Sequence, residues 1–142
     1  TRLESLVQSL NLTDKIVFIG EIKDPNILVK YYTAADVFCL TPREMDGDVE
    51  GYGVVFLEAS ACKLPVIGSS SYGVIDAVDD GKTGFLVPPD NPRELAIKIE
   101  LLYHDKELRE RLGINNRRKA ELHSWDKIVK KYEALYYKVL SP

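Results

Sequence analysis

The sequence predicts an α/β protein, a three-layer sandwich in which helices cover both faces of a mainly parallel sheet, with three helices at its C-terminal end. Short apolar runs alternate with helical patterns over residues 1–90, the arrangement expected of β-α-β units with right-handed crossovers. The run Val37–Leu40 is apolar without alternation, which is typical of a strand buried on both faces of a parallel sheet. Residues 91–142 show only helical periodicity. We therefore expect a single domain with an α/β core at 1–90 and C-terminal helices at 91–142.

The first half of the chain predicts these elements in order: a helix ending near Asn11, a strand at Val17–Ile19 closed by Gly20, a helix from Asn26 to about Ala34, the buried strand Val37–Leu40, a polar loop from Thr41 to Asp48, and an apolar helix ending at Cys62. A strand at Pro65–Gly68, a turn at Ser69–Gly73, a short helix at Val74–Val78 and a last strand at Phe85–Val87 follow. In parallel sheets ligands bind beyond the carboxyl ends of the strands. The loops after Ile19, Leu40 and Gly68 are therefore expected to lie together.

Three helices complete the chain. Asn91, Pro92 and Glu94 supply an N-cap, a proline at the first helical position and an acid three residues after the cap. Asp105 can cap a helix to about Ala120, and Ser124 can cap the last one. That last helix carries a stripe of apolar residues at Trp125, Ile128, Val129, Tyr132, Leu135, Tyr136 and Val139. Such a stripe is typical of core packing, and it predicts a helix clamped across the domain.

Composition excludes several classes of protein. The chain has 142 residues, of which 45% are hydrophobic and 29% charged, as in an ordinary globular domain. Its net charge of −3 gives no basic field that would recruit nucleic acid. The two cysteines, Cys39 and Cys62, fall in a strand and a helix predicted to be buried, which favours a reducing, cytoplasmic setting. No apolar run approaches the ~20 residues that a membrane span needs.

The segment Glu50–Glu58 (EGYGVVFLE) is the most informative part of the chain. Its two carboxylates flank a Gly-x-Gly turn that opens the apolar helix. Glycines there let backbone N–H groups approach a phosphate or a polyhydroxyl group closely. Glu58 is a charge among apolar neighbours, so it either binds a ligand or is favoured by the dipole of the helix.

The run Glu50–Gly68 (EGYGVVFLEASACKLPVIG) resembles the donor-site signature of the GT4 family of GT-B glycosyltransferases, which has two glutamates separated by seven residues. The segments Val17–Glu44 and Asp79–Ala96 resemble the parts of that family on either side, so the match covers nearly the whole chain in order. The resemblance implies a Rossmann-like fold, the C-terminal half-domain of a GT-B enzyme. It also implies that a first strand with an Arg/Lys loop, and an N-terminal acceptor-binding domain, would precede Thr1. In such an enzyme the last helix would cross back to that domain, so part of its apolar stripe would be exposed in this chain.

The resemblance implies a role for each motif position. Glu50 would face the transferred sugar as the catalytic residue, and Glu58 would bind the ribose, since a carboxylate can accept from two vicinal hydroxyls. The turn would offer backbone N–H groups to the sugar and the diphosphate from Gly51, Tyr52, Gly53 and Val54. The loop Gly20–Lys23, with Glu21 and Ile22, would cover the base. No metal and no cofactor are implied, and His104 and His123 are expected at the surface or at helix ends.

These features together predict a retaining glycosyltransferase that moves a hexose from a nucleotide diphosphate sugar to a glycan or lipid-linked acceptor. The chain would be its donor-binding part, inactive alone, and the full-length enzyme would be cytoplasmic or peripheral at a membrane. Two other classes remain open: an isomerase like UDP-N-acetylglucosamine 2-epimerase, and a non-catalytic binding or assembly module. A calcium loop is disfavoured. Asp46, Asp48, Glu50 and Gly51 imitate the start of an EF-hand, but its twelfth position is Leu57.

Overall fold

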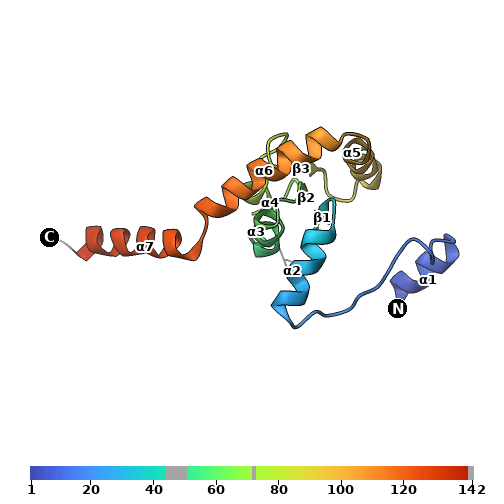
Figure 1. Ribbon diagram of the computed structural model, residues 1–142, viewed down its shortest axis with the longest axis horizontal. Coiled ribbons are helices and arrows are strands. Elements are labelled where there is room, and N and C mark those ends of the chain that lie inside the picture. The colour runs from blue at the N-terminus through green and yellow to red at the C-terminus, as the bar shows by residue number, and fades with distance from the viewer. Residues whose placement is uncertain (44–50, 72, 141–142) are drawn as a thin grey trace.

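The computed structural model describes residues 1–43, 51–71 and 73–140, so Glu50 and most of the predicted loop Thr41–Asp48 lie outside the described residues. The helices are α1 (Arg2–Ser9), α2 (Pro25–Ala34), α3 (Val54–Ala61), α4 (Val74–Ala77), α5 (Pro92–His104), α6 (Lys106–Leu122) and α7 (Trp125–Leu140). The strands are β1 (Phe38–Leu40), β2 (Val66–Ser69) and β3 (Gly84–Val87). Figure 1 shows helices around a small central sheet.

Local sequence signals explain most of the helix starts. The side chains of Thr1, Asp24, Asn91 and Asp105 accept hydrogen bonds from the first backbone N–H groups of α1, α2, α5 and α6. Each cap satisfies a donor that has no partner inside its helix. The predicted caps Asn91 and Asp105 are thereby confirmed.

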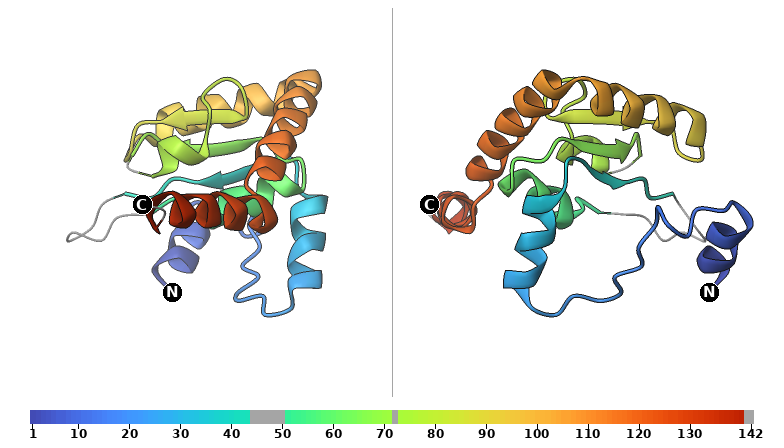
Figure 2. Two further views of the ribbon diagram at one scale, coloured as in Figure 1. Left: turned by 90° about the vertical axis from the view of Figure 1, so that its left-hand side faces the viewer. Right: turned by 45° about the vertical axis from the view of Figure 1, so that its right-hand side comes forward.

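The sheet is parallel, in the order β1-β2-β3, with Phe38 opposite Val66 and Ile67 opposite Phe85. Successive residues of β2 point to opposite faces. Val66 packs in one core cluster with Phe56 of α3 and Val74 of α4, whereas Ile67 packs in the other with Leu102 of α5 and Leu112 of α6. Helices therefore cover both faces, and the predicted three-layer arrangement is confirmed (Figure 2).

The predicted strand at Val17–Ile19 is wrong. These residues form an extended but exposed segment, and Val17 is 83% exposed. In Figures 1 and 2 the segment runs away from the sheet, between α1 and α2. An extended segment becomes a strand only when a neighbouring strand pairs with its backbone groups. No described strand lies beside it.

The buried character predicted for Val37–Leu40 is also wrong in part. Val37, Phe38 and Leu40 are half-buried, and Cys39 is exposed, because β1 is an edge strand among the described residues. Cys62, predicted to be buried in the helix, is half-buried at the end of α3. Burial of a strand depends on what covers each face, which an apolar run alone does not specify.

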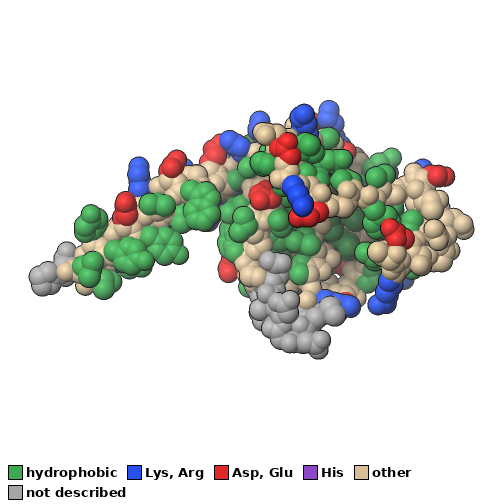
Figure 3. All heavy atoms as spheres, turned by 90° about the horizontal axis from the view of Figure 1, so that it is seen from below, with side chains coloured by type: hydrophobic (Ala, Val, Ile, Leu, Met, Phe, Trp, Pro, Cys, Tyr) green, Lys and Arg blue, Asp and Glu red, His purple; other side chains and the backbone are tan. Residues whose placement is uncertain are grey.

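The last helix does not clamp across the domain. α7 has no buried residue, and it projects from the body of the protein (Figure 1). Figure 3 shows hydrophobic side chains gathered along this projecting helix. Its stripe includes Trp125, Tyr136 and Val139, which are 80%, 62% and 73% exposed. The periodicity therefore correctly predicts a helix, but the apolar stripe of that helix does not pack in the described core.

Candidate functional site

The predicted donor-binding turn lies at the start of α3. Gly53, the residue before the helix, has a φ of 66°, in the left-handed region that favours glycine. No side chain among the described residues caps α3, in contrast to α1, α2, α5 and α6. Phe56 donates its backbone N–H to the carbonyl oxygen of Gly53 at 2.8 Å, so among the described residues the N–H groups of Val54 and Val55 keep their capacity to bind an anion or a sugar oxygen.

The loop after β2 packs directly on this turn. A Cβ placed on Gly73 would lie 2.2 Å from the carbonyl oxygen of Gly51 and 2.9 Å from the backbone nitrogen of Tyr52. Only a residue without a side chain allows this approach. The sequence predicts that the loops after Leu40 and Gly68 lie together. Gly73, in the loop after Gly68, makes the contact with Gly51, which follows the loop after Leu40.

Tyr52, at the centre of the turn, faces the end of α6. Its ring lies 6.1 Å from the ring of His123, between centroids, at an interplanar angle of 33°. Its hydroxyl is buried and has no hydrogen-bond partner among the described residues. Burial, then the charges of Asp79 and Asp76, raise the pKa of Tyr52. The hydroxyl is therefore protonated at neutral pH and can donate a hydrogen bond.

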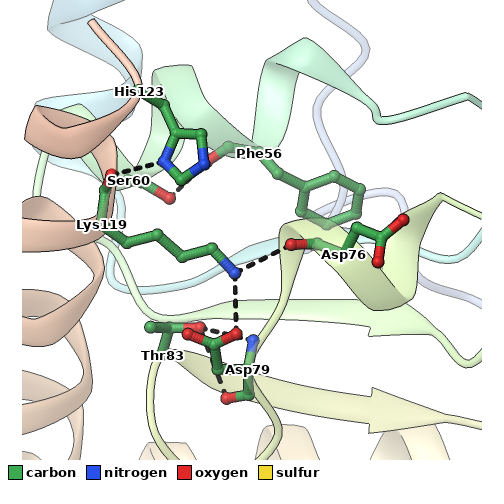
Figure 4. A network of polar contacts seen from close by, with 7 residues as sticks. All are labelled: Phe56, Ser60, Asp76, Asp79, Thr83, Lys119 and His123. Carbon is green, nitrogen blue, oxygen red and sulfur yellow. Dashed lines mark hydrogen bonds and ion pairs between the residues drawn. The ribbon is translucent and has the colours of Figure 1, made fainter. Parts of the chain in front are cut away.

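His123 is held by a polar network that Figure 4 shows. Its Nδ1 lies 2.8 Å from the carbonyl oxygen of Lys119, and since a carbonyl can only accept, Nδ1 carries the proton. The Nζ of Lys119 donates to the carbonyl oxygen of Asp76 and to Oδ1 of Asp79, both at 2.9 Å. The Lys119 side chain is 12% exposed and that of Asp79 is 51% exposed, so the ion pair is shielded from water on the lysine side only. The network joins the end of α6 to Asp76 of α4 and to Asp79, which follows α4.

Glu58 lies one turn into α3 with its carboxylate exposed. Tyr32 of α2 donates a hydrogen bond from its hydroxyl to Oε2 of Glu58, at 3.0 Å. Glu58 is outside the first turn of the helix, where the dipole would favour an acid. The structure therefore disfavours the interpretation that Glu58 is present because the helix dipole stabilises it.

α6 also holds the other end of α3. Arg117 donates from Nη1 to the carbonyl oxygen of Ala61 at 2.5 Å, and Asn116 donates from Nδ2 to that of Leu64 at 2.6 Å. These carbonyls at and after the end of the helix have no partner within it. α6 thus contacts both ends of the helix that carries Glu58.

The loop predicted to cover the base, residues 20–23, is largely exposed. In residues 20–23 Glu21 is exposed, Ile22 is half-buried, and the Glu21 carboxylate lies 3.8 Å from the Nζ of Lys23. No hydrogen bond or ion pair joins these residues to 51–54 in the part of the chain that the structure describes. This loop follows the segment Val17–Ile19, which does not enter the sheet.

A pocket of about 420 Å³ opens at the carboxyl ends of β1 and β3, where ligands of parallel sheets bind. Thr41, Val87 and Asn91 are among its lining residues. Asp90, also in the lining, pairs with Arg43 at 3.0 Å and so joins the loops after β3 and β1.

Tyr32, Gly73, Arg117 and His123 were not predicted as parts of this site. Tyr32 did offer a signal, since a tyrosine in the expected helix Asn26–Ala34 has a hydroxyl that needs a hydrogen-bond partner when it is buried. Nothing in the spacing of the other three indicated the contacts of Gly73 and His123 with the turn, or that of Arg117 with α3.

Comparison with known proteins places this geometry in a family. The family model described as "Glycosyl transferases group 1" matches residues 1–119. The chain belongs to the glycosyl transferases group 1 family. The family resemblance that the two glutamates carry is thereby confirmed.

Several curated relatives share this part of the family. The chain is 36% identical over 112 residues to the capsular polysaccharide biosynthesis glycosyltransferase CapM of Staphylococcus aureus, covering 79% of the chain and 27% of the relative. It is 36% identical over 126 residues to the D-inositol 3-phosphate glycosyltransferase of Streptomyces bingchenggensis, covering 89% and 26%. It therefore spans about a quarter of the length of these relatives.

Solved structures agree with the fold. Sucrose-phosphate synthase from Thermosynechococcus elongatus is similar over 99% of this chain and 34% of its own, with a TM-score of 0.84 and 35% identity. A glycosyltransferase from Rickettsia africae has a TM-score of 0.85 at 24% identity, over 99% and 36%. The predicted fold, the C-terminal half-domain of a GT-B glycosyltransferase, is therefore confirmed.

Two other features concern membranes and metals. Among the residues that the structure describes, none of the helices combines the length and the hydrophobicity that a membrane span requires. No group of three His, Cys, Asp or Glu side chains is placed to hold a metal ion in residues 1–43, 51–71 and 73–140.

Proposed function

We propose that this chain is the donor-binding part of a retaining glycosyltransferase, which transfers a hexose from a nucleotide diphosphate sugar to an acceptor. The acceptor-binding part would lie elsewhere in the full-length protein, so the chain alone would be inactive. The observation that carries the proposal is the pairing of an uncapped helix start with a glutamate one turn along the same helix, in a member of this family.

Each part of the turn suits one part of a nucleotide sugar. The free N–H groups at the start of α3 would bind the diphosphate or sugar oxygens, because a helix N-terminus carries partial positive charge. The exposed Glu58 carboxylate would accept hydrogen bonds from the ribose hydroxyls. Glu50, outside the described residues, would face the transferred sugar.

The chemistry would depend mainly on stabilising the leaving diphosphate. Backbone N–H groups fixed before the reaction stabilise negative charge as it develops, without further reorganisation. The contact of Gly73 with Gly51 and the contacts of α6 with α3 would hold these groups in place. No metal ion is required in this scheme.

A structural neighbour supports a uridine nucleotide as the first ligand to test. Anabaena Alr3699/HepE in complex with UDP is similar over 98% of this chain, with a TM-score of 0.82 and 25% identity. This likeness does not choose between bases, so guanosine and adenosine nucleotides belong in the same experiment.

Nucleotide binding is tested by NMR titration of the full-length protein with UDP, GDP, ADP and their sugars, with Glu58→Ala as the control. We expect shifts in residues 51–58 with one nucleotide, and loss of affinity in the Glu58→Ala variant. The absence of shifts with every nucleotide would refute a donor site here.

Catalysis is tested in the full-length protein with Glu50→Ala. We expect transfer to be lost while nucleotide affinity is kept, because Glu50 would contact the sugar and not the nucleotide. Unchanged turnover would remove Glu50 from the mechanism. Conversion of the sugar nucleotide without any acceptor would instead support the epimerase alternative.

A further inference from the structure

Tyr32 and Glu58 form the one side-chain hydrogen bond that α2 makes with α3 among the described residues. The Tyr32 hydroxyl donates to Oε2 of Glu58 at 3.0 Å, across 26 positions of sequence. We propose that Tyr32 is a positioning residue for Glu58, which orients the carboxylate to receive the vicinal hydroxyls of a ribose. This inference rests on the proposed function, and it adds a residue that no motif position indicated.

The Tyr32 ring is fixed relative to α3 by aromatic packing. It lies 5.8 Å from the ring of Phe38, which in turn meets the ring of Phe56 edge-on at 5.5 Å, between centroids. Phe56 is fully buried and precedes Glu58 by two residues on the same helix. The hydroxyl therefore has a set position with respect to the helix that carries the carboxylate.

The carboxylate itself has little else to hold it. Glu58 is exposed, and a free glutamate side chain loses rotamer entropy when a ligand orders it. A hydrogen bond formed before the ligand arrives removes part of that cost.

The bond also leaves the carboxylate able to bind a diol. A carboxylate has about four acceptor positions, and Tyr32 occupies one of them, on Oε2. Oε1 accepts no hydrogen bond from any side chain in the described part of the protein. Two hydroxyls on neighbouring carbons can therefore still donate to the same group.

The phenol remains a donor throughout the neutral range. Burial, then the hydrogen bond to Glu58 and the charge of Glu58, raise the pKa of Tyr32 to about 12. Tyr32 is therefore protonated at neutral pH. The pair keeps one arrangement, phenol donating and carboxylate accepting.

The test compares ribonucleotides with their 2′-deoxy forms in the full-length protein. Calorimetry would give the affinity for UDP, GDP and ADP, each paired with its 2′-deoxy analogue, and the ratio within a pair measures recognition of the ribose. Tyr32→Phe keeps the ring and removes the hydroxyl. Tyr31→Phe is the matched control, because Tyr31 is the exposed neighbour on the same helix.

We expect Tyr32→Phe to reduce the ribose preference about threefold to tenfold, since a hydrogen bond to a charged group is worth on the order of tenfold in affinity. Tyr31→Phe should leave the preference unchanged, and Glu58→Ala should abolish it. In the Glu58→Ala background, Tyr32→Phe should have no further effect on the ratio. General damage to the fold would lower both affinities of a pair and leave their ratio unchanged.

The outcomes separate the two proposals. If Glu58→Ala abolishes the preference and Tyr32→Phe keeps it, Tyr32 does not position the carboxylate, and the donor site stands. If Glu58→Ala keeps the wild-type preference, Glu58 does not bind ribose, and both ideas fail. Should Tyr32→Phe not fold, Glu58→Asp withdraws the carboxylate from the hydroxyl by one methylene. An unchanged preference in that variant would overturn the inference.

Discussion

His123 and Tyr52 join the end of α6 to the turn at the start of α3, with ring centroids 6.1 Å apart. The contact places a residue from the C-terminal helices against the backbone that the proposed function assigns to the donor. Because Lys119 holds His123 and also contacts Asp76 and Asp79, the turn is tied to the rest of the domain by packing as well as by chain connectivity.

We expect His123→Ala to loosen the turn, because it removes both the ring against Tyr52 and the hydrogen bond to Lys119. Backbone resonances of Tyr52 and Gly53 should shift, and the free energy of unfolding should fall by about 1 kcal/mol. His104→Ala is the control, since the His104 ring meets the ring of Tyr103 edge-on, away from the turn. Equal shifts at Tyr52 in both variants would contradict a specific role for His123.

Gly73→Ala should displace the turn, because its Cβ would lie 2.2 Å from the carbonyl oxygen of Gly51. Overpacking of this kind costs about 1–3 kcal/mol, which chemical denaturation would measure. Gly51→Ala makes the matched comparison, since a Cβ there meets nothing within 4 Å. A Gly73→Ala protein as stable as Gly51→Ala would show that the loops separate at no cost.

Arg117→Ala should destabilise the far end of α3. The guanidinium donates to the carbonyl oxygen of Ala61, where a positive charge also complements the helix dipole. A lost hydrogen bond from a charged group costs about 1.5–3 kcal/mol, measurable by thermal or chemical unfolding. The adjacent Arg118 is exposed, so Arg118→Ala serves as the control. A similar small loss in both variants would assign no special role to Arg117.

Alkaline pH should weaken the fold through Tyr32. Its pKa rises from 10.0 to about 12 in the folded protein, so above pH 10 the unfolded chain releases this proton first. Stability from this group is complete below pH 10 and is lost as the pH rises through 12. Denaturation midpoints of wild type should therefore fall more steeply over this range than those of Tyr32→Phe. Parallel curves would show that Tyr32 titrates normally.

Removal of residues 125–142 should barely change the stability of the remainder, because α7 has no buried residue. Calorimetry of residues 1–124 should give a melting temperature within a few degrees of the whole chain. A shift of ten degrees or more would mean that the apolar stripe of α7 packs against the domain in solution.

Local sequence determined the helices well. The caps at Asn91 and Asp105 and the periodicity of α1, α2 and α7 depend on residues within a few positions of one another. The glycines and glutamates of the motif identified the family for the same reason, since they lie within a single short segment. The three-layer sandwich then followed from the order of elements.

The sequence by itself therefore determined the fold class, the family and the position of the candidate turn. Only the tertiary structure decided that Val17–Ile19 stays outside the sheet, that Cys39 and the stripe of α7 are exposed, and that Tyr32 meets Glu58. Strand pairing and burial depend on residues far away in the chain. Periodicity does not indicate which of those residues will pack against a given segment. The hydroxyl of Tyr32 reaches Glu58 because α2 and α3 pack on one face of the sheet.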